Sequence, residues 1–174
     1  MTIADVLAVL AALVLVGLAF PSLFAAIGLV FPKAIDRGTE QIATHPVRAF
    51  GTGIVTLIGL LVLAGVMKAI LIGPLKALGV LVLLGGLWLV ALGAAALVHH
   101  LASLLAPQTA TKSPLHHIFL GTFLLEFSIL TPFVGWLVVL PVVFFVMLGT
   151  GVHIVWFRPK PTPVVQATPY TFGV

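Results

Sequence analysis

Four stretches of this chain are apolar for longer than a lipid bilayer is thick: residues 3–30, 49–72, 75–106 and 116–157. The hydrocarbon core of a bilayer measures roughly 30 Å, and about 20 residues of α-helix cross it. Inside hydrocarbon every backbone amide has to find its partner within its own segment, so such stretches must be helical. The sequence therefore predicts an all-α integral membrane protein with about four to five hydrophobic helices.

The composition excludes a water-soluble domain. Apolar residues make up 61% of the chain and charged residues 7%, whereas an average soluble domain is roughly half apolar and a quarter charged. The net charge of +4 comes from basic residues dispersed among the predicted loops, so nucleic acid is not expected as a partner. The chain has no cysteine, which excludes disulfides and thiolate metal sites.

The first three predicted spans differ in their ends. The first, residues 3–30, lacks a basic leader, so we expect a retained span and not a cleaved signal peptide. The second, residues 49–72, is ended by Gly73-Pro74, because proline has no amide proton and clashes with the preceding turn. The third, residues 75–106, would reach about 48 Å as one helix. It should project beyond the bilayer or tilt.

A polar segment, residues 31–48, separates the first two spans. It holds five of the twelve charged residues, and its apolar positions Ile35 and Ile42 lie a heptad apart. A heptad is close to two helical turns, so these side chains share one face. The pattern predicts a short amphipathic helix lying on the membrane surface.

The last apolar stretch is too long for one span and is interrupted at Thr131-Pro132-Phe133-Val134-Gly135. It forms either one kinked span or a hairpin of residues 116–130 and 136–157. With the first loop in the cytoplasm, the hairpin places six of the eight Lys and Arg residues inside, and the single span places four there. The positive-inside rule therefore favours the hairpin, with the C-terminus in the cytoplasm of a bacterial cell and the spans in its inner membrane. Residues 1–158 then form one transmembrane domain, followed by a proline-rich extended tail at 159–174.

Four histidines are candidate cofactor ligands. In the hairpin topology all six histidines fall near one membrane face, and His99, His100, His116 and His117 lie on neighbouring helices. Such imidazoles could ligate a haem or a (bacterio)chlorophyll. Adjacent histidines point about 100° apart on a helix, so each pair offers one ligand to a given centre. We expect an interfacial role for them, and no metal site or catalytic residue.

A glycine stripe marks a predicted helix contact. Gly79, Gly86 and Gly93 recur every seven residues in the third span, and His100 continues the series. Glycines let two helix backbones approach closely in a membrane. We expect tight packing at Gly86 and a lipid-facing side chain at Leu83.

Glu126 is the acid of the last apolar stretch, about 15 Å from its start along the helix axis. A buried carboxylate in hydrocarbon is costly, so we expect a neutral, hydrogen-bonded acid. Its candidate partners are Lys68, Ser128, Thr131 and His153.

Five short motifs, taken in order, carry a resemblance to a family. The chain resembles a membrane region of bacterial proteins that is often joined to a bactofilin-like, polymer-forming cytoskeletal domain. The matching motifs, between Phe31 and Gly151, are Phe31-Pro32-Lys33, His45-Pro46-Val47-Arg48, Ile72-Gly73-Pro74-Leu75, Thr131-Pro132-Phe133-Val134-Gly135-Trp136 and Leu148-Gly149-Thr150-Gly151. The resemblance implies a membrane anchor or scaffold without catalytic activity. The soluble domain of the fused members has no counterpart in residues 1–174.

Three functions follow as hypotheses. The first is a noncatalytic membrane scaffold or accessory subunit, which contacts lipids and other membrane subunits, with the tail at 159–174 as a contact. The second is a haem- or chlorophyll-binding subunit of an electron-transfer or light-harvesting complex. The third is a small channel or proton carrier built around Glu126, for which an inverted repeat would be expected but is not found.

Overall fold

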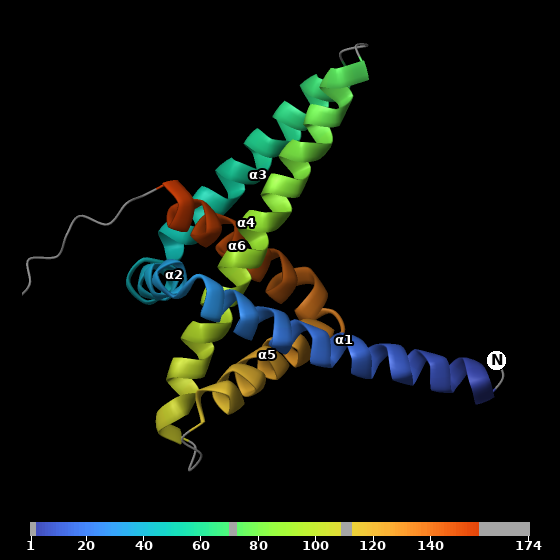
Figure 1. The fold of residues 1–174 in the computed structure, drawn as a ribbon, viewed down its shortest axis with the longest axis vertical. Coiled ribbons are helices and arrows are strands. Elements are labelled where there is room, and N and C mark those ends of the chain that lie inside the picture. The colour runs from blue at the N-terminus through green and yellow to red at the C-terminus, as the bar shows by residue number, and fades with distance from the viewer. Residues whose placement is uncertain (1–2, 70–72, 109–112, 157–174) are drawn as a thin grey trace, which may run out of the picture.

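The structure is a computed structural model that describes residues 3–69, 73–108 and 113–156 (Figure 1). Within these ranges it is helical without any strand, so the predicted fold class is confirmed at this level. Three helices are long and apolar enough to cross a membrane, or four if one sharply bent pair counts as a single span. The elements are α1 (Ile3–Val30), α2 (Pro32–Thr44), α3 (Pro46–Ala69), α4 (Gly73–Leu105), the 3-10 turn η1 (Ala106–Gln108), α5 (Pro114–Leu130), the π-helical turn η2 (Gly135–Val139) and α6 (Leu140–Trp156).

Proline begins most of these helices. The first turns of α2, α3, α4 and α5 contain Pro32, Pro46, Pro74 and Pro114. A first-turn residue has no intrahelical acceptor for its amide, and the fixed φ of proline already suits a helix. Proline in the sequence thus marks the starts of these helices, and α4 begins at the predicted Gly73-Pro74.

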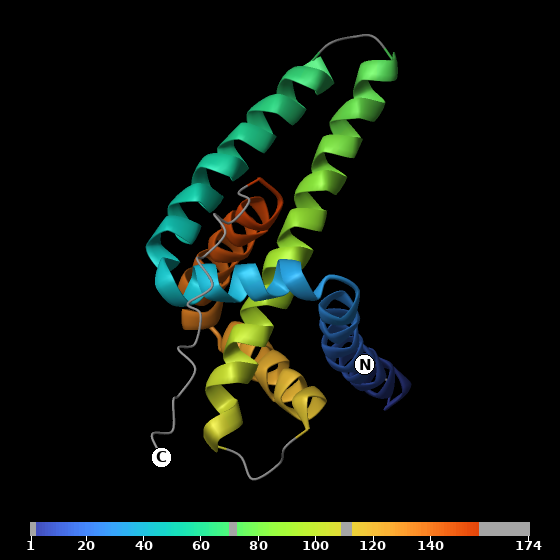
Figure 2. The same ribbon diagram turned by 60° about the vertical axis from the view of Figure 1, so that its left-hand side comes forward.

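Helices α3 and α4 run side by side in opposite directions and form a long arm (Figure 2). Gly79 of α4 lies beside Met67 of α3, and Gly86 lies beside Leu60. Most other side chains of the arm are exposed, and only 6% of the most apolar window of α3 is buried. The 33 residues of α4 extend about 50 Å, so this helix serves both the arm and the core beyond it.

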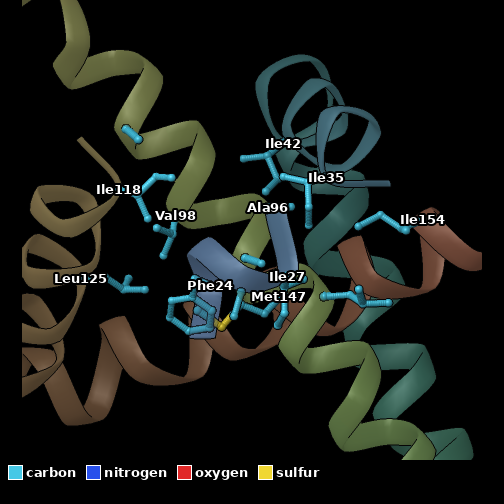
Figure 3. Packing of buried hydrophobic residues seen from close by; sticks show 14 residues of the cluster. Phe24, Ile27, Ile35, Ile42, Ala96, Val98, Ile118, Leu125, Met147 and Ile154 are labelled. Atoms are coloured by element: carbon cyan, nitrogen blue, oxygen red, sulfur yellow. The ribbon is translucent and has the colours of Figure 1, made fainter. Parts of the chain in front are cut away.

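The hydrophobic core surrounds the second half of α4 (Figure 3). Ala95, Ala96 and Val98 of α4 are fully buried, and their small size lets several helices approach the same segment. The cluster also takes side chains from the other helices: Phe24, Ile27, Ile35, Ile42, Ile118, Leu125, Met147 and Ile154. The core therefore forms where α1, α2, α5 and α6 meet one stretch of α4.

Helix α2 is amphipathic as predicted, and its apolar face packs against other helices of the chain. Ile35, Gly38 and Ile42 are buried against α4 and α6, and the hydroxyl of Thr39 donates a hydrogen bond to the carbonyl of Ala96 at 3.3 Å. The protein itself thus covers the apolar face of α2, and the position of this helix on the membrane surface stays a prediction. The chain reaches α2 through a bend of 109° after α1.

Helix α6 packs between α3 and α4, and glycine makes the crossing with α4 possible. A Cβ atom added to Gly93 of α4 would collide with the backbone of Met147. One added to Gly151 of α6 would collide with the backbone of Leu89. Each helix therefore contributes one glycine to the crossing. In α4, Gly93 lies four residues after Leu89, which contacts Gly151. In α6, Gly151 lies four residues after Met147, which contacts Gly93.

The crossing of α6 with α3 repeats this pattern. Gly53 of α3 lies against the backbone of Phe145, and Gly149 of α6 lies against the carbonyl of Ala49. Gly149 and Gly151 are two residues apart and point about 200° from each other on a helix. The Gly149-Thr150-Gly151 segment therefore lets α6 contact a helix backbone on either side.

The predicted break after α5 is a sharp turn. Phe133 takes a left-handed backbone with φ of 64°, and Gly135 lies close to the carbonyls of Ser128 and Ile129. Beyond the turn, α5 and α6 diverge as an open V (Figures 1 and 2). They contact different neighbours, because α5 packs on α1 and α4 whereas α6 packs mainly on α3 and α4. The expected break is present, but its two arms do not pack along each other as a closed hairpin.

Candidate functional site

Glu126 lies between α5 and α1. A Cβ atom added to Gly17 of α1 would sit 3.7 Å from the Oε2 atom of Glu126 and 3.8 Å from the ring of Phe123. The carboxyl group of Glu126 therefore lies beside Gly17, at an ordinary contact distance. Phe20, one turn further along α1, lines the space on both sides of this carboxyl.

Two apolar hollows meet at Glu126. The larger has a volume of about 580 Å³ and is walled by α1, α4 and α5, with Met147 contributed by α6. The second measures about 570 Å³ and lies between α1 and α5. Phe20, Glu126 and Ile129 line both. Volumes of this size are typical of small-molecule sites, which range over about 300–1,000 Å³.

One oxygen atom of the Glu126 carboxyl group lacks a hydrogen-bond donor among the described residues. Its Oε1 atom is buried and accepts no hydrogen bond from any residue that the structure describes. The hydroxyl of Ser128 donates to the carbonyl of Leu124 at 2.7 Å, and that of Thr131 donates to the carbonyl of Phe127 at 3.1 Å. These two predicted partners therefore bond to their own helix. The side chain of Lys68 lies outside the described residues.

His153, the remaining predicted partner of Glu126, lies at a different junction. It is near Arg48 and His45, where α3 begins and α6 ends. Glu126 and His153 are thus on different elements, and the residue beside the Glu126 carboxyl group is Gly17 of α1.

The four candidate cofactor ligands face different surroundings. The ring of His99 lies against Gly28 of α1, and its Nδ1 atom is 2.8 Å from the carbonyl of Ala95. His100 is half-buried, His116 is exposed and His117 is buried. The rings of His116 and His117 are 6.1 Å apart. Among the described residues, no group of three or more potential ligands is placed to hold a metal ion.

The three glycines of the predicted stripe lie at helix contacts that differ in tightness. A Cβ atom at Gly79 would be 3.4 Å from Met67, and one at Gly86 would be 2.9 Å from the Cδ1 atom of Leu60. A leucine methyl group can move, whereas the Met147 backbone that faces Gly93 cannot. Gly93 is therefore the most constrained of the three.

The tail at 159–174 lies outside the described residues, so its predicted contact stays a prediction. Sequence reasoning missed the roles of Gly17, Gly28 and Gly53. In the sequence Gly17 and Gly28 lie inside apolar runs, and Gly53 lies two residues after Gly51. That signal is visible but does not say which helix fills the space.

Comparison with protein-family models, with curated proteins and with solved structures gave no match to this chain.

Proposed function

We propose that this protein is a noncatalytic membrane scaffold or accessory subunit that binds other membrane proteins through the arm of α3 and α4. The observation that carries the proposal is the exposure of the arm, whose apolar side chains are left uncovered by the rest of the chain. Val55 is 71% exposed, Val62 60% and Leu81 61%. Apolar surface on this scale is typical of contact with lipid or with a partner.

One side of α3 is suited to a helical partner. Gly51, Gly59 and Gly65 are exposed, and a Cβ atom at any of them would meet nothing within 4 Å. They differ in this from Gly53, which is packed against α6. Small residues let a second helix approach closely where lipid offers no hydrophobic difference between surfaces. These three glycines are needed for nothing in the described fold, which supports a contact outside it.

Replacing Gly59 by leucine tests this contact. We expect the variant to fold as the wild type does and to lose a co-purifying membrane partner, with affinity lowered about tenfold or more by the blocked approach. Purification in mild detergent followed by mass spectrometry measures the partner. The control is Ala26→Leu, at an exposed position of α1 outside the arm, which should keep the partner. An unchanged set of partners in the Gly59 variant would contradict the proposal.

We further propose that the C-terminus lies in the cytoplasm of a bacterial cell. The turn at residues 131–134 sends α6 back from α5 (Figure 1), and this reversal supports the arrangement with six basic residues inside. The proline-rich tail would then meet a cytoplasmic or membrane partner. A fluorescent reporter fused after Val174 should be active, whereas a phosphatase fused there should be inactive. The reverse result would place the tail outside.

A further inference from the structure

The larger hollow, between α1, α4 and α5, combines an apolar wall with one buried acceptor. Its volume is about 580 Å³, and its lining includes Phe24, Leu87, Trp88, Ala94 and Leu125. The Oε1 atom of Glu126 is buried at its edge and accepts no hydrogen bond from the described residues. A ligand that fills this hollow therefore needs an apolar body.

The polar groups of the wall decide what else the ligand needs. Besides Glu126, the lining contains one hydroxyl, that of Thr122. Its proton is already donated to the carbonyl of Ile118 at 2.9 Å, so only its acceptor lone pair is left. A carboxyl group, ionised or neutral, always keeps acceptor capacity. Because Thr122 is fully buried, the carboxyl group of Glu126 is the acceptor that a donor from the ligand would satisfy.

We propose that the hollow binds a lipophilic alcohol, a molecule with a long hydrocarbon body and one terminal hydroxyl group. The hydroxyl donates a hydrogen bond to Oε1 of Glu126, and the hydrocarbon body lies along α4 between Leu87 and Ala94. The second hollow begins at the same carboxyl group, so a longer or branched chain can extend toward Gly17. This proposal is independent of the scaffold function, because it uses none of the exposed surface of α3.

A phospholipid acyl chain is the competing occupant. It would fill the apolar volume but would leave the buried Oε1 atom of Glu126 without a donor. An unpaired buried acceptor costs free energy that a hydroxyl group recovers. The two occupants therefore differ in a single hydrogen bond, and matched probes can distinguish them.

The experiment uses quenching of Trp88, which lines the hollow. Trp136 and Trp156 are replaced by phenylalanine, and the full-length protein in detergent is titrated with 11-bromoundecanol or with 1-bromoundecane, which lacks the hydroxyl group. We expect the alcohol to quench Trp88 at about fivefold lower concentration, the worth of one hydrogen bond. A variant that keeps only Trp136, which is 69% exposed and outside both linings, should show no such preference.

Two variants at Glu126 complete the test. Glu126→Leu removes the acceptor and should abolish the preference for the alcohol, while Glu126→Gln keeps an amide oxygen and should retain it. Helical content measured by circular dichroism shows whether each variant is folded. Equal quenching by both probes in the wild type would overturn the proposal in favour of an acyl chain. A preference that survives in Glu126→Leu, or one that is lost in a folded Glu126→Gln, would overturn it as well.

Discussion

Gly93→Ala is expected to destabilise the folded protein by about 3 kcal/mol, at the upper end of the usual cost of overpacking. The added methyl group would collide with the backbone of Met147 on α6. Backbone cannot rotate away as a side chain can, so α4 and α6 would have to separate. Because Leu92, Ala94, Ala95 and Met147 are buried at the same place, separation opens the core. Unfolding in a denaturing detergent, followed by circular dichroism, measures the loss.

Gly85→Ala is the matched control in the same helix. A Cβ atom there meets nothing within 4 Å, and alanine favours a helix over glycine by about 1 kcal/mol. The control should therefore be neutral or slightly stabilising. Gly86→Ala should fall between the two, because the neighbouring methyl group of Leu60 can move. Equal stability of the Gly93 and Gly85 variants would show that α6 does not pack on α4 in this way.

A cysteine at Ile35 is expected to react with a maleimide about tenfold or more slowly than one at Asp36, because labelling there requires α2 to open. Ile35 is 2% exposed and faces α4 and α6, whereas Asp36 on the same turn is exposed. The chain has no native cysteine, so each single variant reports on one site. Labelling is followed by the mass change of the folded protein in detergent.

Gly38→Leu should remove this protection. A Cβ atom at Gly38 would lie 2.8 Å from Ile154 and 3.1 Å from Thr150, and a leucine side chain leaves no room for α2 on α6. In that background the cysteine at Ile35 should label as fast as the one at Asp36. Ala43→Leu, at an exposed position of the same helix, is the control and should leave the protection intact. Fast labelling of Ile35→Cys in the wild-type background would mean that the apolar face of α2 lies on lipid or detergent instead.

The sequence by itself determined which segments are helical and where most of them start. Long apolar runs can satisfy their amides only within a helix when water is excluded, and proline lies in the first turn of α2, α3, α4 and α5. The charge pattern of α2 also predicted which of its faces is buried, because charged and apolar residues alternate there with the helical period. In each of these cases the information is local.

Only the tertiary structure decided which helix meets which. The helices other than α2 are apolar on every side, and lipid and a neighbouring helix are equally apolar environments, so hydrophobicity does not mark the inner face. Seventeen glycines are present in the chain, yet Gly93 meets a backbone and Gly85 meets nothing. Glu126 was recognisable as unusual from its residue type, but the space beside Gly17 that receives it depends on the approach of α1. Such contacts depend on shape complementarity between distant segments, and no local pattern in the sequence encodes that shape.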